Sequence, residues 1–252
     1  MHPFISILGK VVPVYGFFMA LGFFTVCVLS SFHIRENHLS INNFFIICAT
    51  SMGFALLGAK ILYIAVTYSF SYIIHSIFSF NFSFLFDGGL VFYGGLLMGV
   101  LGAFLGAFIA KTNLFLYENT IVPCIPFGHA IGRIGCFFAG CCYGIPYTGH
   151  GSVLYPINNT YVYVLPIQLV EALFTVFIGI FLTEYARRKH KKYSVLCLYL
   201  TLYSIERFFL EFFRGDIMRG RFALFSTSQW ISLTLLLFCL LRFLYVKTKK
   251  AP

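Results

Sequence analysis

Apolar runs of about 20 residues recur along the whole chain, and this repetition is the feature that most limits its fold. A helix of that length spans the hydrocarbon core of a bilayer, and a helix satisfies its own backbone hydrogen bonds there. Only 10% of the 252 residues are charged and the mean hydropathy is +0.88, values outside the range of soluble globular domains. We therefore predict an all-α integral membrane protein.

The hydrophobic pattern predicts a bundle of about seven transmembrane helices within one domain. The N-terminus lacks a basic stretch ahead of a short apolar core, so we expect the first run to remain as a helix. No Pro-rich or Ser-rich linker divides the chain, so we expect a single polytopic domain over residues 1–252. The predicted spans are approximately 13–33, 42–68, 88–110, 119–138, 166–186, 193–213 and 225–246.

The distribution of Lys and Arg predicts the orientation of this bundle. With the N-terminus outside, eleven cations fall on inner segments and four on outer segments, while Lys60, Arg133 and Arg207 lie at membrane depth. Because cations concentrate on the cytoplasmic side, we predict an outer N-terminus and a cytoplasmic C-terminus. The net charge of +10 then reflects topology and anionic lipid, and we expect no nucleic-acid partner. The inner cations are Arg35, Lys111, Arg187, Arg188, Lys189, Lys191, Lys192, Arg242, Lys247, Lys249 and Lys250, and the outer ones are Lys10, Arg214, Arg219 and Arg221.

Two predicted outer segments differ from ordinary connections. Residues 69–87 are rich in Phe and Ser, and the part from Phe78 to Phe84 alternates with a period of two. An open strand cannot lie unpaired in lipid, so we expect this segment at the interface as a surface helix or an extended arm. Residues 145–165 contain Pro, Asn and several Tyr residues, and are expected to form an outer loop with interfacial aromatic anchors.

The stretch 132–144 places Arg133 and three cysteines among glycines inside an apolar run. A charged side chain at membrane depth is costly, so Arg133 indicates a functional site. For Cys136, Cys141 and Cys142 we weigh small-residue packing, a redox or disulfide-forming role, and a metal site. Their spacing matches no common zinc pattern, so the sequence predicts no metal and no cofactor.

A second set of charges ends the sixth predicted span. Arg207, Glu211 and Arg214 follow one another at intervals of four and three residues, so on a helix they share one face. One interpretation is a structural network of salt bridges. Two arginines at membrane depth instead favour an anion, because a guanidinium binds phosphate in a bidentate manner. The abundant anion in a bilayer is a phospholipid head group, so we predict an anionic phospholipid as ligand.

Short motifs along the chain resemble, in order and almost from end to end, those of the prolipoprotein diacylglyceryl transferase family. The resemblance implies a multi-pass enzyme of about seven spans in the inner (cytoplasmic) membrane of a bacterium. It implies transfer of the diacylglyceryl group of phosphatidylglycerol to the lipobox cysteine thiol of a prolipoprotein, with release of glycerol phosphate. The motifs are Val14-Tyr15-Gly16, Gly58-Ala59-Lys60, Asp87 to Gly95, Pro126-Phe127-Gly128, Gly132-Arg133-Ile134-Gly135, Pro166-Ile167-Gln168-Leu169-Val170-Glu171 and Glu206 to Asp216.

The resemblance also implies roles for individual residues. Arg133 and Arg207 would bind the phosphate and stabilise charge on the leaving group, and Tyr93, between two glycine pairs, would be a further catalytic residue. From the residues alone, the segment around Tyr93 could equally serve close helix packing. The substrate-binding residues implied are Tyr15, Arg133, Gly144, Gln168, Glu171, Arg207, Glu211 and Arg214.

The chain departs from the family pattern at several polar positions. The family has asparagine at Cys136, an acidic residue at Cys141 and histidine at Tyr93. These changes keep two other hypotheses open. One is a divergent paralogue that engages phospholipid but modifies another acceptor, and the other is a non-enzymatic lipid-binding, redox or transport protein. The remaining departures are Lys60 for arginine, Ala139 for asparagine and Leu165 for histidine, and His129 is a substitute candidate for proton transfer.

Overall fold

The computed structural model describes residues 4–7, 10–86, 89, 91–157, 160–188, 194–215, 221–222 and 224–249. Within them the chain is mostly helical, and each predicted span coincides with a helix along most of its length. The chain divides into two compact units. The first contains residues up to 33 and from 118 onward, and the second contains residues 34–117.

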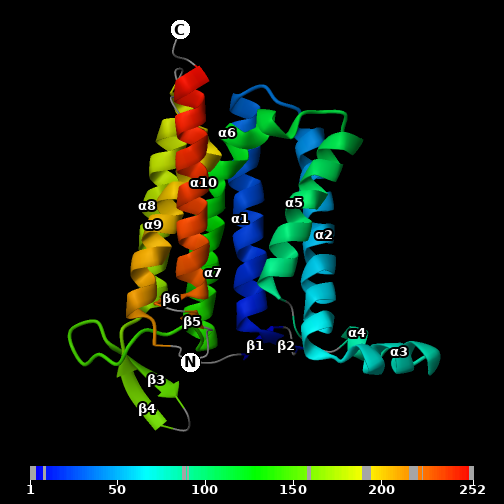
Figure 1. The fold of residues 1–252 in the computed structure, drawn as a ribbon, viewed down its shortest axis with the longest axis vertical. Coiled ribbons are helices and arrows are strands. Elements are labelled where there is room, and N and C mark those ends of the chain that lie inside the picture. Colours follow the sequence, from blue (N-terminus) through cyan, green and yellow to red (C-terminus); the bar gives the residue numbers. More distant parts are fainter. Residues whose placement is uncertain are drawn as a thin grey trace. The chain divides into compact units, whose positions relative to one another are not determined.

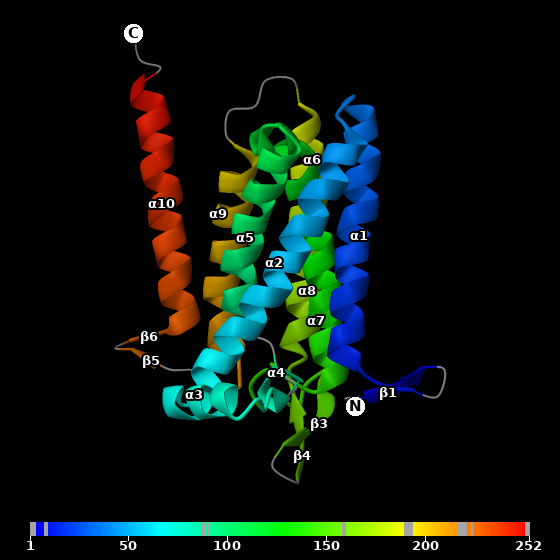
Figure 2. The same cartoon turned by 90° about the vertical axis from the view of Figure 1, so that its right-hand side faces the viewer.

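The first unit is a bundle whose helices follow one another in space as in sequence. Helix α7 packs on α8, α8 on α9, and α9 on α10, as Figures 1 and 2 show. Short 3-10 segments extend two of them: η2 (Val122–Cys124) precedes α7 and η3 (Glu211–Phe213) continues α9. The helices are α1 (Val14–Glu36), α6 (Glu118–Ile121), α7 (Ile125–Ala139), α8 (Ile167–Arg187), α9 (Val195–Leu210) and α10 (Thr227–Lys249).

Three small antiparallel hairpins lie at the end of this unit where α7 and α9 end (Figure 1). They are β1 (Phe4–Ile7) with β2 (Lys10–Pro13), β3 (Val153–Ile157) with β4 (Thr160–Val164), and β5 (Arg221–Phe222) with β6 (Phe225–Ser226). The β3–β4 hairpin falls inside the segment 145–165, for which the sequence predicted a loop. Alternating Tyr and Val residues along β4 favour a strand, and Tyr155 and Val164 face the interior as buried residues.

The second unit is built on the long contact between α2 (Ile41–Thr67) and α5 (Phe92–Ile109). Glycines of α5 permit this contact: a Cβ on Gly102 would lie 2.6 Å from the carbonyl oxygen of Thr50 on α2. At Gly95 the corresponding distance to the Ala55 carbonyl oxygen is 3.2 Å. The two backbones therefore approach as closely as in small-residue pairs of membrane helices. The 3-10 segment η1 (Leu114–Tyr117) ends the unit.

The described part of the segment 69–87 contains two helices and no strand, in line with the helical alternative. Helix α3 (Phe70–Phe78) is followed by a break and then by the short helix α4 (Ser83–Phe86). The period-two pattern from Phe78 to Phe84 makes no strand, because it spans the end of one helix and the start of the next. Phe78 and Phe80 are exposed and Phe84 is buried. Asp87, the last residue of the segment, lies outside the described residues.

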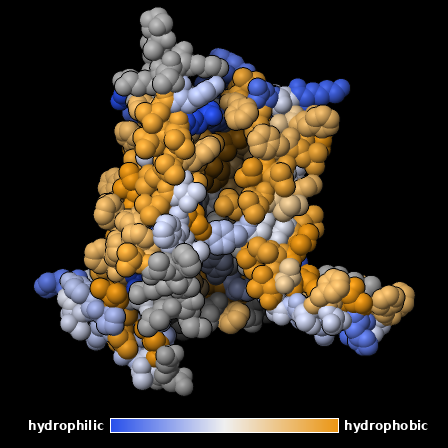
Figure 3. Space-filling model, viewed as in Figure 1, coloured by the Kyte–Doolittle hydropathy of each residue, from blue (hydrophilic) through white to orange (hydrophobic). Residues whose placement is uncertain are grey.

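The outer surface of the helices is apolar. Among the described residues, five helical segments are long and apolar enough to cross a membrane: Val14–Glu36, Ile41–Thr67, Leu114–Ala139, Ile167–Arg187 and Thr227–Tyr245. In the view of Figure 3, hydrophobic side chains cover most of the helical surface and hydrophilic ones gather towards the ends of the helices. Such a surface matches a bilayer rather than water, which confirms an integral membrane protein made mostly of helices.

Candidate active site

Helix α7, which carries Arg133, lies close to α1 because glycines form the contact. A Cβ on Gly128 would lie 2.8 Å from the carbonyl oxygen of Gly22 on α1. A Cβ on Gly135 would lie 2.6 Å from the Cβ of Phe18. Both distances are too short for a carbon atom, so only glycine allows this approach. Gly128 and Gly135 therefore allow α7 to lie directly against α1.

The Arg133 guanidinium meets a buried carboxylate on the neighbouring helix α8. Its Nη2 lies 2.7 Å from Oε1 of Glu171, and the Glu171 side chain is 1% exposed. Arg207 on α9 approaches the same carboxylate, with Nη1 3.7 Å from Oε2. Nη2 of Arg207 lies 2.6 Å from Oε2 of Glu211. We call these four residues from α7, α8, α9 and η3 the arginine cluster.

The charges of the arginine cluster balance, but its hydrogen-bonding capacity is not used up. Nε of Arg133 and Nη1 of Arg207 are buried and make no hydrogen bond to any described residue. Leaving a buried donor without an acceptor costs about 1–3 kcal/mol, so a cluster with two such donors favours an added acceptor. The two guanidinium groups can therefore bind the oxygens of an anion with charge-assisted hydrogen bonds.

Hydroxyl groups support the arginine cluster from α8 and α10. Ser228, in the first turn of α10, accepts a hydrogen bond from Nη2 of Arg207 at 3.3 Å. Thr175 lies one turn after Glu171 and donates to the Glu171 carbonyl oxygen at 2.6 Å. The Thr175 hydroxyl also lies 3.2 Å from Oε1 of Glu206. These contacts restrict the rotamers of the charged side chains, as a preorganised site requires.

Aromatic rings close another side of the cluster. Nε2 of His129 on α7 lies 3.9 Å from Oε1 of Glu171. The His129 ring makes an edge-to-face contact with the ring of Tyr203 on α9, with centroids 5.0 Å apart. His129 is thus part of the wall of the arginine cluster, where a histidine can exchange a proton with a neighbouring carboxylate.

Gln168 links the start of α8 to the loop that follows α7. Its Nε2 donates to the Cys141 carbonyl oxygen at 2.7 Å and to the Tyr155 hydroxyl at 2.9 Å. The Tyr155 hydroxyl in turn donates to the carbonyl oxygen of Phe137 at 3.3 Å. Burial raises the pKa of Tyr155, so its hydroxyl stays protonated and remains a donor. These bonds hold the loop against the last turn of α7.

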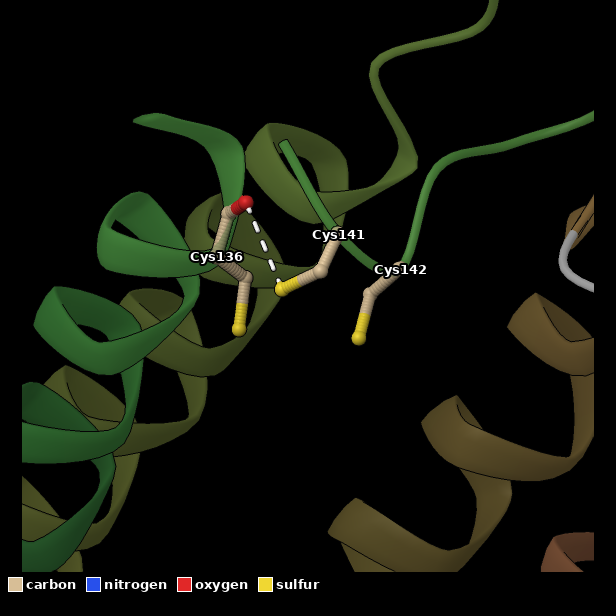
Figure 4. A group of neighbouring side chains, drawn as sticks. All are labelled: Cys136, Cys141 and Cys142. Carbon is tan, nitrogen blue, oxygen red and sulfur yellow. Dashed lines mark hydrogen bonds between the residues drawn. The ribbon is translucent and has the colours of Figure 1, made fainter. Parts of the chain in front are cut away.

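Three thiols converge where α7 ends (Figure 4). The Sγ atoms of Cys136, Cys141 and Cys142 all lie within 4.8 Å of one another. The Cys141 thiol donates to the Cys136 carbonyl oxygen at 3.6 Å. All eight cysteines of the chain lie among the described residues, and none of them forms a disulfide. We call these three residues the thiol cluster.

The thiol cluster lies beside Arg214. Hydrogen bonds from Cys136 and Cys141, together with the Arg214 guanidinium, lower the pKa of Cys142. Hydrogen bonding to Cys136 and Cys142 raises the pKa of Cys141. The backbone of Arg214 bridges to that of Gly144, which joins the end of α9 to the cysteine loop. The Arg214 guanidinium therefore favours the thiolate form of Cys142.

Known proteins match this chain over nearly its whole length. The sequence profile described as prolipoprotein diacylglyceryl transferase matches residues 3–245. The chain is 32% identical over 237 residues to "phosphatidylglycerol--prolipoprotein diacylglyceryl transferase 2" of Clostridium perfringens, covering 92% of this chain and 90% of the relative. The chain belongs to the prolipoprotein diacylglyceryl transferase family. Proteins named phosphatidylglycerol--prolipoprotein diacylglyceryl transferase in Clostridium tetani and Clostridium kluyveri are 31% and 28% identical, over 87% and 91% of the chain and the same shares of the relatives.

For a member of this family, most of the predicted site residues lie in the first unit. Tyr15, in the first turn of α1, is exposed and interacts electrostatically with Arg133 and with all three cysteines. Tyr93 lies in the second unit, near the start of α5, where its ring is exposed. Asp87, Gly88 and Leu90 of the same family motif lie outside the described residues. The arginine cluster unites Arg133, Glu171, Arg207 and Glu211, while Gly144, Gln168 and Arg214 surround the thiol cluster.

Sequence reasoning missed four residues of this site. Thr175 and Tyr203 each lie four residues from a predicted site residue on the same helix, so helical spacing could have found them. Tyr155 and Ser228 reach the site from a hairpin and from α10, and no local pattern marks them. Tertiary packing alone brings these two side chains in.

Proposed function

We propose that this protein is a phosphatidylglycerol–prolipoprotein diacylglyceryl transferase. It transfers the diacylglyceryl group of phosphatidylglycerol to the lipobox cysteine thiol of a prolipoprotein and releases glycerol phosphate. One observation carries the proposal: Arg133 and Arg207 share the carboxylate of Glu171 and each keeps a buried guanidinium N–H group without a hydrogen bond. Family membership and the names of the relatives support the same reaction.

The arginine cluster suits a reaction in which charge develops on a phosphate. As the bond between the glyceryl carbon and the phosphate oxygen breaks, its electron pair stays on the oxygen of the leaving glycerol phosphate. Guanidinium donors already fixed near that oxygen stabilise the new charge without reorganisation, and each such donor contributes about 100-fold to 1,000-fold in rate. Glu171 and Glu211 orient the two guanidinium groups and offset their charge before the lipid binds.

The other predicted residues are proposed to shape the substrate site. Gln168 and Gly144 hold the loop after α7, and Arg214 places a third cation beside it. Tyr15 is proposed to contact the lipid or the peptide from the start of α1, since it interacts electrostatically with Arg133. Tyr93 is proposed to supply a hydroxyl group for the reaction.

We propose that the chain crosses the bacterial inner membrane seven times, as one polytopic domain with an outer N-terminus and a cytoplasmic C-terminus. Besides the five long segments, α5 has 18 residues and α9 has 16. At 1.5 Å per residue these helices are about 27 Å and 24 Å long, close to the thickness of the hydrocarbon core. The positive-inside rule supports this orientation. The segments near 69–87 and 145–165 are proposed to lie at the outer interface.

The test uses substitutions that keep the positive charge. Arg133→Lys and Arg207→Lys retain a cation beside Glu171 but lose the planar fork of donors. We expect each variant to insert normally and to lose about 100-fold or more of its diacylglyceryl transfer rate. The assay is mass spectrometry of a lipobox reporter in cells depleted of their own transferase. Arg187→Lys, at an exposed position on α8, is the matched control and should complement fully.

The reporter also separates the competing functions. A diacylglyceryl group on the lipobox cysteine supports the proposed reaction. Release of glycerol phosphate from phosphatidylglycerol without modification of the reporter would indicate another acceptor. Correctly inserted protein that does neither would be a lipid-binding or redox protein, and full activity of both lysine variants would remove the arginine cluster from the reaction.

A further inference from the structure

The geometry of the thiol cluster resembles three of the four ligand positions of a tetrahedral metal site. All three Sγ atoms lie within 4.8 Å of one another, and Figure 4 shows them directed into the same space. With zinc–sulfur bonds of about 2.3 Å, tetrahedral zinc requires its sulfur ligands to lie about 3.8 Å apart. The three thiols therefore need to move by no more than about 1 Å to ligate one ion.

The backbone holds the thiols in these positions. Gly140 ends α7 with φ 80°, and Cys142 has φ 60°, a left-handed conformation that is uncommon for any residue other than glycine. The Cys141 amide donates to the Cys136 carbonyl oxygen at 3.1 Å. The Cys141 carbonyl oxygen accepts the 2.7 Å hydrogen bond from Gln168. The loop is thus tied to α7 and α8, and its sulfur atoms are placed before any ligand binds.

Charges around the cluster favour a cation held by thiolates. Three thiolates around Zn²⁺ carry a net charge of −1. Arg214 interacts with Cys142, and Arg133 lies one helical turn from Cys136 and interacts with it electrostatically. These guanidinium groups compensate the excess negative charge of a three-thiolate site, which an apolar surrounding would disfavour.

The cluster supplies three ligands and leaves a fourth position. Among the described residues, no His, Asp, Glu or further Cys places a fourth donor atom within this group. Zinc sites with three protein ligands and an open vertex are typical of catalysis, whereas structural zinc sites are closed by four. Cys141 is exposed, so an external ligand can reach this side of the cluster.

We propose that Cys136, Cys141 and Cys142 bind one Zn²⁺ ion whose open position holds the acceptor cysteine of the lipobox peptide as a thiolate. This proposal rests on the proposed transferase function and names the group that activates its nucleophile. A thiol that coordinates zinc is deprotonated, so the site removes the need for a separate base close to the peptide.

The step balances without an oxidant or a reductant. The incoming thiol displaces water from zinc and releases its proton to that solvent. A sulfur electron pair then forms the bond to the glyceryl carbon, and the carbon–oxygen pair leaves with glycerol phosphate. Arg133 and Cys136 are three residues apart on α7, so nucleophile and leaving group bind to neighbouring parts of one helix. The zinc ion keeps its oxidation state throughout.

Metal content is the first test. Full-length protein purified in detergent and equilibrated with Zn²⁺ should hold one zinc per chain after removal of free metal. Cys136→Ser and Cys142→Ser should each lower the affinity for zinc at least about 10-fold, whereas Cys239→Ser, at a buried cysteine on α10, should leave it unchanged. A wild-type protein that holds no zinc, or that has lost two titratable thiols to a disulfide within the cluster, would overturn the proposal.

Cobalt(II) in place of zinc tests the fourth position directly. Its thiolate charge-transfer bands should intensify when a lipobox peptide is added and stay unchanged with the same peptide carrying serine instead of cysteine. Zinc removal from the wild-type protein should lower diacylglyceryl transfer at least about 100-fold, with recovery on adding Zn²⁺. Equal activity with and without zinc would refute the zinc role and leave the transferase intact. A cobalt response to the peptide in a protein that never transfers lipid would instead refute the transferase function and support the site.

Discussion

Replacing Glu171 by glutamine removes one negative charge from the arginine cluster and keeps the volume of the side chain. Glu171 is 1% exposed, and Arg133, at 2.7 Å, is 14% exposed. In the variant the Arg133 guanidinium stays buried without its ion-pair partner. Breaking a buried ion pair from one side costs about 3–5 kcal/mol. The equilibrium constant for unfolding should therefore rise about 100-fold to 5,000-fold.

A double-mutant cycle measures the interaction energy between Glu171 and Arg133. Arg133→Gln alone should cost a similar free energy, because Glu171 then keeps only longer contacts, 3.7 Å to Arg207 and 3.9 Å to His129. In the double variant both charges are gone, while Arg207 remains paired with Glu211 at 2.6 Å. We expect the double variant to lose less stability than the two single variants added together, with a coupling energy of about 1–3 kcal/mol.

The measurement is unfolding in mixed micelles by titration with a denaturing detergent, followed by circular dichroism. Glu184→Gln is the control on the same helix: Glu184 is 68% exposed and pairs with Arg187 at 3.9 Å. Its loss should change stability by less than about 0.5 kcal/mol. If the costs of the two single variants add within about 0.5 kcal/mol, or if Glu171→Gln is as mild as the control, the charge-pair reasoning is wrong.

Gly102→Ala should destabilise the second unit by about 1–3 kcal/mol, since the new Cβ would lie 2.6 Å from a carbonyl oxygen of α2. Gly53→Ala, where a Cβ would meet no atom within 4 Å, should leave stability unchanged, and thermal unfolding distinguishes the two variants. Tyr155→Phe should cost about 1–2 kcal/mol in the same measurement, because it removes a buried hydroxyl with several hydrogen bonds, and an unchanged transition temperature would speak against this network. In metal-free protein near neutral pH, iodoacetamide should modify Cys142 before the more exposed Cys141, because the pKa of Cys142 is lowered and that of Cys141 is raised. Peptide mapping measures the order of modification, and the reverse order would contradict these pKa directions.

Much of the fold and part of the site follow from sequence patterns alone. The apolar runs predict the helices because a segment that crosses a bilayer must have a minimum length and must pair its own backbone hydrogen-bonding groups. Arg133 and Arg207 stand out because charge at membrane depth is rare. The same reasoning cannot show that both arginines meet Glu171, since the three residues lie on three helices and only helix packing sets their distances.

The sequence marked Cys136, Cys141 and Cys142 as a group, but it could not show that their sulfur atoms converge. A C-x4-C-C spacing brings its sulfur atoms together only through the left-handed backbone at Gly140 and Cys142. For Cys142 such a conformation is intrinsically unfavourable, so local propensity argues against it. The β3–β4 hairpin was missed because its strands are short and lie among residues typical of loops.

The hydrogen bond between Arg207 and Ser228 has a consequence for observing the protein at work. Trp230, the single tryptophan of the chain, lies two residues after Ser228, and its ring contacts Phe225 with centroids 5.6 Å apart. Phe225 in turn contacts Phe208, the neighbour of Arg207, at 5.6 Å. We expect binding of an anion to Arg207 to change the surroundings of Trp230 through Ser228 and this aromatic stack. The single tryptophan of the chain is therefore linked to Arg207 by a short series of contacts, and its emission can serve as a probe of binding and release in real time without an attached label.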